Sequence, residues 1–389
     1  MKKQWQAKIL SDVLEVQNGY AFDSKAFDSS KGMPLIRIRD LKEGTETETR
    51  FNGDYEKKYI VKDGDLLIGM DGEFGCYEWK GGPALLNQRV CRLQGFDSQL
   101  LPRFLFYGVN SHLKAIEDVT GFTTVKHLSS KQILGIKFLL PPLPEQQRIV
   151  GILDEAFDGI ATATANAEKN LQNARALFES HLQSIFTQHG EGWVEKRLDE
   201  VCTFSSGGTP SKSKRSYWNG KIPWVSGRDM KSTQLSDSLL HISRSAVDES
   251  STRMAPTGTL LILVRGMGLA HGTQIAELMV PCAFNQDIRG IHSRPGLIPR
   301  YLLFALRGRI NSSDNILSNA AHGTLKIDSD ELKGVMIPVP SRGHQQKVVA
   351  TIESLSEETQ RLQSIYQQKL AALDELKKSL LHQAFSGEL

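Results

Sequence analysis

The two halves of the chain repeat one another, and this repeat limits the possible folds more than any other feature. Four segments of the first half recur in the same order in the second half, displaced by roughly 190 to 200 residues. The matched pairs are Lys8–Val13 with Lys196–Val201, Asn87–Gln88 with Asn285–Gln286, Leu101–Phe106 with Ile298–Leu303, and Gly135–Pro141 with Gly334–Pro340. Because all four keep their order, the sequence predicts a tandem duplication.

The composition is that of a folded protein without a membrane segment. The 389 residues are 40% apolar and 23% charged, which excludes a disordered chain. The longest aliphatic run, Leu260–Val264, is far shorter than the ~20 residues that a membrane-spanning helix needs. The first residues, Met1–Gln6, turn polar at once, unlike a secretion signal. We therefore expect a soluble, cytoplasmic protein.

Charge and cysteine content narrow the function classes only a little. The net charge is 47 − 44 = +3 and the pI is about 8.5, which permits a nucleic-acid partner without requiring one. The four cysteines are too far apart for a zinc site and too few for a disulfide framework. We expect them to be buried thiols, and we expect no metal site.

Each half is predicted to form a mixed α/β domain followed by one long helix. Short apolar runs that follow turns, such as Asp65–Gly69 and Thr259–Val264, predict strands. Apolar residues then recur in steps of three and four from Ile149 to Ile185 and from Val348 to Ala384. Each of these stretches predicts a helix of ~40 residues, about 60 Å long.

The apolar residues of each long helix form one seam, and connectivity predicts that the two seams pair in antiparallel fashion. The second domain begins where the first helix ends, so the second helix starts beside that end and can run back along it. Small residues in the first helix would allow close approach. The predicted seam residues are Ile149, Leu153, Ala156, Ile160, Ala163, Ala167, Leu171, Ala174, Val348, Ile352, Leu355, Leu362, Leu370 and Leu373.

These elements predict an α+β fold with pseudo-two-fold symmetry. Two similar mixed α/β domains are expected at opposite ends of a coiled coil of two long antiparallel helices. The expected segments are 1–143 (first domain), 144–190 (central helix), 191–341 (second domain) and 342–389 (distal helix). Two similar domains at a fixed separation suit duplex DNA, whose half-sites lie about one helical turn, ~34 Å, or multiples apart. Because the halves are not identical, we predict an asymmetric, bipartite target.

Four segments carry a resemblance to a known family. They are Leu140–Val150 at the start of the first long helix, the closing Ser379–Leu389, Gly64–Gly72 and Asn87–Arg89. With them, the chain resembles the specificity subunit of type I restriction-modification systems over essentially its whole length. The segment Pro340–Gln346 departs from the usual form of the motif because it lacks the Pro-Glu step.

The resemblance implies a DNA-binding subunit without catalytic activity. Each mixed segment would be a target-recognition domain, and the helices would bind methyltransferase subunits and set the spacing of the half-sites. The implied partners are double-stranded DNA, two modification (adenine methyltransferase) subunits and, in systems that have them, restriction subunits, with no membrane partner. This chain would hold no cofactor. S-adenosylmethionine is expected on the methyltransferase subunits, and ATP and Mg²⁺ on a restriction subunit.

Basic and aromatic residues on the predicted loops are the candidates for DNA contact, because phosphate contacts position a protein and base contacts specify the sequence. Arg228 or Arg265 would suit the O6 and N7 atoms of guanine. Such charge runs are also typical of solvated loops, and Arg37 and Arg39 would fit an ion pair with Asp40 or Glu43 equally well. The candidates are Lys25, Lys31, Arg37, Arg39, Lys212, Lys214, Arg215, Tyr217, Trp218, Lys221, Arg228 and Arg265.

Two other function classes fit parts of the sequence. Asp65 or Asp71 with Glu78–Lys80 loosely matches a metal-dependent nuclease, but the second half has no such set. A coiled-coil scaffold whose end domains bind proteins is the other alternative. The sequence has no Walker loop, no methyltransferase motif of the Asn/Asp-Pro-Pro-aromatic type and no His-Glu-x-x-His pair. We therefore predict no catalytic residue.

Overall fold

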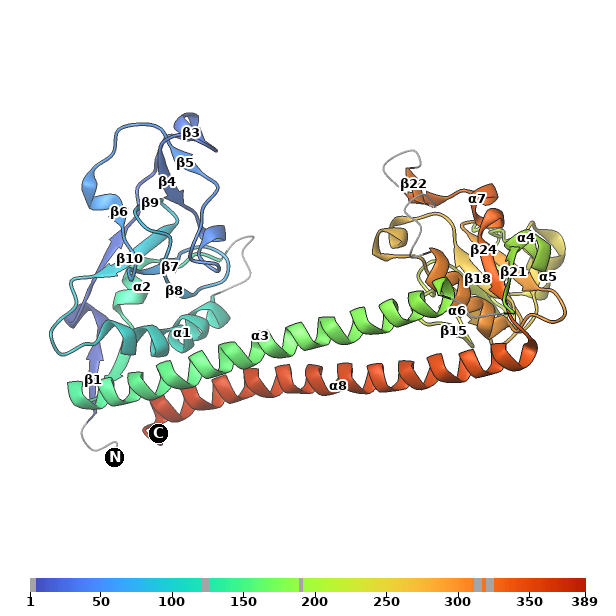
Figure 1. The fold of residues 1–389 in the computed structure, drawn as a ribbon. Helices are drawn as coiled ribbons and strands as arrows, with labels where there is room; N and C mark the ends of the chain where they lie inside the picture. Colours follow the sequence, from blue (N-terminus) through green and yellow to red (C-terminus); the bar gives the residue numbers. More distant parts are fainter. Residues whose placement is uncertain (1–4, 121–125, 189–191, 311–316, 320–324) are drawn as a thin grey trace. The chain divides into compact units, whose positions relative to one another are not determined.

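The structure, a computed structural model, describes residues 5–120, 126–188, 192–310, 317–319 and 325–389. The chain forms two compact units. The first comprises Met1–Asn166 with Lys369–Leu389, and the second comprises Ala167–Gln368. Each unit contains one mixed α/β domain and a segment from each of two long helices (Figure 1).

Two sheets form the body of the first domain. A four-stranded sheet has the order β2 (Glu15–Asn18), β10 (Val90–Gln94), β7 (Leu66–Gly69), β8 (Cys76–Glu78). A five-stranded sheet has the order β3 (Phe27–Asp28), β5 (Arg50–Phe51), β4 (Met33–Ile36), β9 (Ala84–Leu86), β6 (Ile60–Val61). The predicted strand after Asp65 is confirmed, and its four residues are all buried, as expected for a strand covered on both faces. In the second sheet β4 and β9 are parallel.

Helices and a short strand pair connect this body to the first long helix. α1 (Pro102–Val119) begins with a proline in its first turn, where no backbone N–H is needed. α2 (Ser130–Leu134) follows, and β11 (Lys137–Leu140) then pairs antiparallel with β1 (Gln6–Ile9). The core of the unit joins α1, α2 and the four-stranded sheet to the long helices through Ile149, Leu153 and Ala384.

The second domain repeats this plan. One sheet has the order β13 (Cys202–Ser206), β21 (Ile288–Ser293), β18 (Leu260–Leu263), β19 (Ile275–Leu278), β15 (Gln234–Leu235). The other has the order β16 (Leu240–Ile242), β14 (Ile222–Val225), β20 (Cys282–Phe284), β17 (Met254–Ala255). Here β14 and β20 are the parallel pair, in the places of β4 and β9. The duplication predicted from the sequence is therefore a duplication of structure.

Some of the remaining elements of the second domain also have counterparts in the first. α6 (Pro299–Ile310) corresponds to α1 and likewise begins with proline. β12 (Val194–Arg197) pairs antiparallel with β24 (Met336–Val339), as β1 pairs with β11. The short helices are α4 (Leu198–Val201), α5 (Arg244–Glu249) and α7 (Ser329–Gly334), and β22 (Leu317–Asn319) pairs with β23 (Leu325–Ile327).

The two long helices are α3 (Leu143–Thr187) and α8 (Arg342–Ser386), each of 45 residues. In the first unit the start of α3 meets the end of α8, where Arg148 Nη2 donates to the backbone oxygen of Leu389 at 2.7 Å. In the second unit the end of α3 and the start of α8 share one core, with Phe186 and Ile352 both buried in it. Within each unit the helices are therefore antiparallel, as predicted (Figure 1).

The predicted seam residues are buried or half-buried, with one exception. Those that are buried are Ile149, Leu153, Ala167, Ala174 and Ile352. Those that are half-buried are Ala156, Ile160, Ala163, Leu171, Val348, Leu355, Leu370 and Leu373. The prediction for Leu362 is wrong, because its side chain is 42% exposed. The inward positions of that turn are taken by Thr359, which is 8% exposed, and by the half-buried Gln363.

Other expectations concern cysteines and membrane segments. All four cysteines are buried and free, as predicted. Burial raises the pKa of the Cys91 thiol to about 12, so this side chain packs as a neutral group. Among the residues that the structure describes, no helix is long and apolar enough to cross a lipid bilayer.

A buried glutamine fastens the start of each long helix. Gln146 is fully buried, and its Oε1 accepts from the backbone N–H of Leu101 at 2.8 Å. Its Nε2 donates to the carbonyl oxygens of Gln99 and Pro141 at 2.7 and 2.8 Å. The long helix is thereby bonded both to the loop before α1 and to the turn before itself.

Gln345 makes the same three bonds in the second unit. Its Oε1 accepts from Ile298 N at 2.9 Å, and its Nε2 donates to the carbonyl oxygens of Gly296 and Pro340, both at 3.0 Å. The departure of the second motif from the usual Pro-Glu form therefore leaves the glutamine in place.

Replacing Gln146 with leucine should destabilise the first unit. The change leaves one backbone N–H and two carbonyl groups buried without a partner, so we expect the free energy of unfolding to fall by about 2–4 kcal/mol. Gln147 is exposed, so Gln147→Leu should change it by less than about 0.5 kcal/mol. Urea denaturation followed by circular dichroism measures both, and equal effects would contradict the role given to Gln146.

Candidate nucleic-acid interface

In the first domain, two loops follow neighbouring parallel strands and meet at one edge of the sheet. β4 leads into Arg37–Arg39, and β9 leads into Asn87–Arg89. Since the carboxyl ends of parallel strands lie at the same edge, this arrangement gathers side chains from distant parts of the chain. The two loops line a cavity of 580 Å³, together with residues that include Phe22 and Phe27.

The basic residues of this edge differ in how they are held. Arg39 Nη2 donates to Thr49 Oγ1 at 3.2 Å, and its Nε lies 3.7 Å from the Asp40 carboxylate. Arg39 therefore forms the ion pair with Asp40 that the sequence offered as an alternative to DNA contact. Arg37 makes no ion pair with any described residue, and the side-chain amide of Gln88 has no hydrogen bond there. Both side chains are exposed, so they are available to an incoming ligand.

The second domain has a matching edge, at which some side chains are kept and Ser226 replaces Arg37. β14 leads into Ser226–Arg228 and β20 into Asn285–Asp287. The two turns after β4 and β14 are built alike, since Asp40 accepts from Arg37 N and Asp229 accepts from Ser226 N, each at 2.8 Å. Arg228 thus corresponds to Arg39, and Gln286 to Gln88. Arg228 is exposed, and it forms no ion pair within the described part of the chain.

A third strand end adds charges to each edge, and two of these charges are inverted between the domains. After β7, Asp71 accepts a hydrogen bond from His127 Nδ1 at 2.6 Å and lies 3.3 Å from Arg89 Nε. After β18, the backbone of Arg265 forms an isolated antiparallel β-bridge with that of Lys326. The backbones of Asp71 and His127 form the same kind of β-bridge in the first domain. The backbone bonds also match, because Met70 N donates to Arg89 O and Val264 N to Asp287 O. The counterparts of Asp71, Arg89 and His127 are therefore Arg265, Asp287 and Lys326.

The aromatic residues predicted from Ser211–Trp218 are structural. Tyr217 is buried and its hydroxyl donates to Glu249 at 2.9 Å, so its assignment to DNA contact is corrected. Trp218 is half-buried, donates Nε1–H to the Ser211 carbonyl at 3.1 Å and meets the Trp224 ring edge-on at 5.1 Å. Both side chains serve the small core of this sheet.

Lys214 belongs to the same structural group. Its ammonium lies 2.6 Å from the Glu249 carboxylate and 3.0 Å from the Tyr217 hydroxyl. The hydrogen bond with Glu249 raises the pKa of Lys214. Lys214 is thus already neutralised, unlike Lys212 two residues earlier, which is exposed and forms no ion pair with a described residue.

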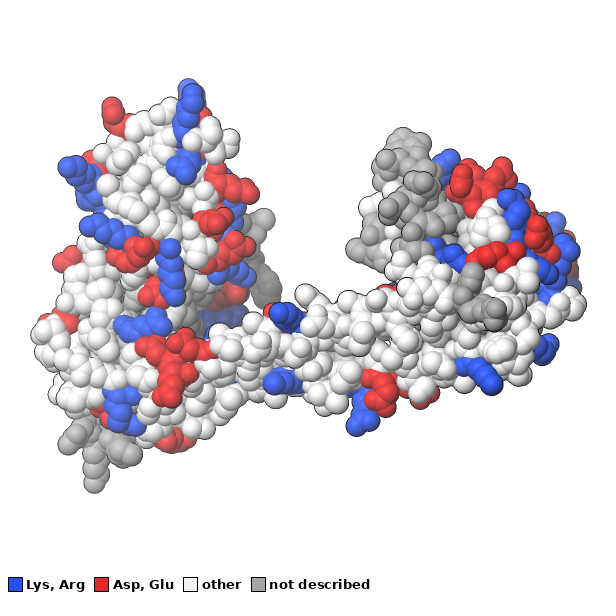
Figure 2. Space-filling model, in the orientation of Figure 1, with Lys and Arg blue, Asp and Glu red and all other residues white. Residues whose placement is uncertain are grey.

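The other candidates lie on exposed surface. In the first domain, Lys25 stands between the cavity-lining residues Ser24 and Phe27, and Lys31 follows the turn that Asp28 caps by accepting from its backbone N–H at 2.9 Å. The exposed candidates of the second domain are Lys212, Arg215, Lys221, Arg228 and Arg265. On the face seen in Figure 2, basic and acidic side chains are interspersed over each unit. That face therefore shows no large area of basic side chains alone.

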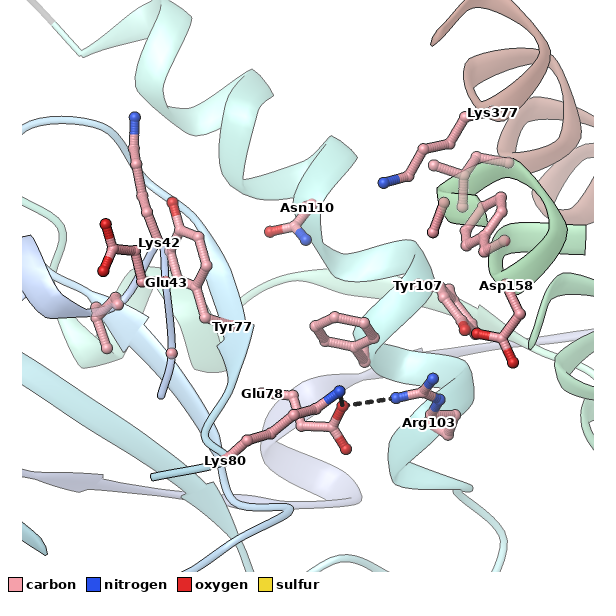
Figure 3. A pocket seen from close by; sticks show the side chains of 16 residues that line it. Lys42, Glu43, Tyr77, Glu78, Lys80, Arg103, Tyr107, Asn110, Asp158 and Lys377 are labelled. Atoms are coloured by element: carbon pink, nitrogen blue, oxygen red, sulfur yellow. Dashed lines mark hydrogen bonds and ion pairs between the residues drawn. The ribbon is translucent and has the colours of Figure 1, made fainter. Parts of the chain in front are cut away.

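The carboxylates of the nuclease alternative are engaged by arginines. Glu78 lines a cavity of 440 Å³, where its carboxylate lies 2.8 Å from Arg103 Nη1 and 3.3 Å from Lys80 Nζ (Figure 3). Asp65 lies 3.0 Å from Arg92 Nη1. Within the described residues no group of three histidine, cysteine or acidic side chains is placed to hold a metal ion. The carboxylates of Glu78 and Asp65 are thus placed to make ion pairs.

Several residues of the two edges were not among the sequence candidates. They are Asp71, Gln88, Arg89, His127, Gln286 and Lys326. The recurrence of Asn-Gln after an apolar strand in both halves was the signal that could have found Gln88 and Gln286. His127 is 56 residues from Asp71, so no local pattern could have revealed that contact.

Comparisons with known proteins agree with this architecture. The family model described as "Type I restriction modification DNA specificity domain" matches residues 2–172 and 190–369. The chain is 27% identical over 409 aligned positions to the type I restriction enzyme EcoBI specificity subunit of Escherichia coli, covering 99% of this chain and 86% of that protein. It is 30% identical to the EcoR124I/EcoR124II specificity subunit of E. coli, over 66% of this chain and 64% of that protein.

Two solved structures share the fold. The first, described as "Structural basis underlying complex assembly and conformational transition of the type I R-M system", has a TM-score of 0.80 at 19% identity. The match covers 100% of this chain and 99% of that one. The second is the HsdS subunit from Thermoanaerobacter tengcongensis, with a TM-score of 0.56 at 18% identity, covering 100% and 98%.

Proposed function

Because the chain belongs to the family of type I restriction-modification DNA specificity subunits, we propose that it reads an asymmetric DNA target of two half-sites through its two sheet edges. The family is the non-catalytic subunit that supplies sequence-specific DNA recognition. The observation that supports two unlike half-sites is the pair of edges itself. They share a backbone plan, but Asp71 and Arg89 stand in one where Arg265 and Asp287 stand in the other.

The residue types at the edges suit base recognition in the major groove. A glutamine amide can pair with N6 and N7 of adenine, and an arginine with O6 and N7 of guanine. Gln88 and Arg37 in the first domain are exposed and project from rigid strand ends, as Arg228 does in the second. The exposed lysines around them, Lys25 and Lys212, would hold phosphates.

We further propose that two adenine methyltransferase subunits bind this chain, with restriction subunits joining in systems that contain them. Apolar side chains on the outer faces of the long helices support a protein partner there. In α3 the side chain of Leu177 is 66% exposed, and in α8 that of Leu376 is 47% exposed. S-adenosylmethionine would then bind the methyltransferase subunits, and ATP and Mg²⁺ a restriction subunit.

Exchanging the second domain should change one half of the target. If residues 196–340 are replaced by the matching segment of another specificity subunit, we expect the half-site read by the second domain to change and the other to stay. Sequencing of methylated adenines across the host genome reads both halves at once. A simultaneous change in both would contradict the assignment of one half-site to each domain.

Lys212 and Lys214 form a matched pair for testing phosphate contact. In the complex with its methyltransferase subunits, Lys212→Ala should lower DNA affinity and reduce the slope of log K against log salt by about one, because one phosphate contact is lost. Lys214→Ala should leave that slope unchanged, since Glu249 already neutralises this ammonium. A filter-binding titration at several salt concentrations gives both slopes. If Lys214→Ala reduced the slope and Lys212→Ala did not, the assignment of a phosphate contact to Lys212 would be wrong.

The purified chain alone should neither methylate nor cleave DNA. Incubation of duplex DNA with the chain, Mg²⁺ and S-adenosylmethionine should yield no product until methyltransferase subunits are added. Cleavage that requires Mg²⁺ and disappears in Glu78→Ala would restore the nuclease alternative. Binding of protein ligands by the domains, without any affinity for duplex DNA in the assembled complex, would favour the scaffold alternative.

A further inference from the structure

One arginine in the first unit connects three elements. Arg103, on α1, lies 2.8 Å from the carboxylate of Glu78 on β8 through Nη1. Its Nη2 and Nε lie 2.8 and 2.9 Å from Asp154 Oδ1 on α3. Figure 3 shows the Arg103 side chain reaching toward Glu78 from the helix that carries it. A single guanidinium therefore ties the sheet, the first helix and the long helix together.

The same connection recurs in the second unit. Arg300, on α6, lies 2.9 Å from the carboxylate of Glu353 on α8 and 3.9 Å from that of Glu277 on β19. Glu277 faces Leu260 in the ladder as Glu78 faces Leu66, so the two glutamates occupy equivalent positions. We call each set of one arginine and two carboxylates an arginine clamp.

In the second clamp the contact between the arginine and the strand glutamate is longer than in the first. Arg300 Nη1 is buried and makes no hydrogen bond with a described residue, and its nearest carboxylate is the one 3.9 Å away. Burial raises the pKa of Glu277, although the charge of Arg300 lowers it in part. In the first clamp both carboxylates are within hydrogen-bonding distance, so that clamp is the more complete.

The surroundings of each clamp favour arginine over lysine. The guanidinium of Arg103 lies 5.2 Å from the ring centre of Tyr107, and that of Arg300 lies 4.8 Å from the ring centre of Phe304. The Tyr107 hydroxyl also bonds to Asp154. A planar fork can face a ring while it bridges two carboxylates, whereas an ammonium acts as a point charge.

Clamp and glutamine together attach each long helix at two points. Asp154 follows Gln146 by eight residues, and Glu353 follows Gln345 by eight. Eight residues of helix span about 12 Å, so the two attachments are separated by more than two turns. The apolar core holds each domain against its helix, and two directional attachments more than two turns apart additionally fix the tilt of the domain. The side chains of the first clamp are partly exposed, so their ion pairs contribute little to stability compared with their effect on geometry.

We propose that Arg103 and Arg300 are positioning residues that fix the tilt of each recognition domain on its long helix and so determine how strictly the spacer between the half-sites is measured. This inference rests on the proposed function. One added base pair moves a half-site by about 3.4 Å and turns it by about a tenth of a turn. A domain whose tilt is fixed cannot follow a half-site displaced in this way, so binding is lost. A domain that can change its tilt can still contact the displaced half-site.

The test uses the complete complex with its methyltransferase subunits and a set of targets. The targets carry the native half-sites with the native spacer or with one or two base pairs more or fewer. We expect Arg103→Met to methylate the spacers altered by one base pair about tenfold better, relative to the native spacer, than the unmodified complex does. The half-site sequences should not change. Arg103→Lys should give an intermediate ratio, because its ammonium can hold one carboxylate but not both.

Two controls separate positioning from general destabilisation. Ile68→Val removes a buried methylene group from the core of the same domain and should lower stability without altering the spacer ratio. Lys378→Met breaks an exposed pair with Asp374 on α8 and should also leave the ratio unchanged. If Arg103→Met fails to fold, Arg103→Lys and Asp154→Asn carry the test.

The outcomes distinguish the two proposals. An unchanged spacer ratio in folded, active variants of Arg103 and Arg300 overturns the clamp inference and leaves the proposed function intact. An equal change in Ile68→Val also overturns it, because any loss of stability would then suffice. Absence of two-part methylation in the unmodified complex contradicts the proposed function itself.

Discussion

Each unit depends on a buried side-chain amide, because burial of such a group without hydrogen bonds is costly. The elements that supply its partners are held in place by these bonds. Gln146 and Gln345 have three backbone partners each, drawn from the loop before α1 or α6 and from the turn that starts the long helix. Because an unsatisfied polar group inside a core is costly, a helix start displaced by one residue would lose all three bonds. The three bonds therefore fix the start of the long helix relative to the loop that leads into α1 or α6.

The sequence was sufficient for the duplication and for the long helices, because both depend on patterns that repeat along the chain. It was less successful inside the helix pair, where Thr359 and Gln363 occupy inward positions that a search for apolar residues passes over in favour of Leu362. It also could not tell Lys212 from Lys214, since the difference lies in Glu249, 35 residues further along. An ion pair between segments far apart in the sequence depends on tertiary structure.

The two domains show how a duplicated scaffold acquires unlike surfaces. Strand order, the parallel pair, the glutamine and the arginine clamp are kept in both copies. The side chains that follow the strand ends are kept only in part: Gln88 and Arg39 recur as Gln286 and Arg228, but Asp71 with Arg89 has been exchanged for Arg265 with Asp287. Residues that hold the fold together are shared, and the divergence lies among some of the residues that face outward.

The position of the outward-facing residues also bears on how such a chain changes over generations. Arg37, Gln88 and Arg228 follow short strands whose last residues are fully buried, while their own side chains are exposed. Substitutions there cost little folding free energy, because no packed contact is removed. A lineage can therefore pass through many variants of these loops without losing a foldable protein. The residues that vary at these loops are therefore different from the residues on which the stability of the fold depends.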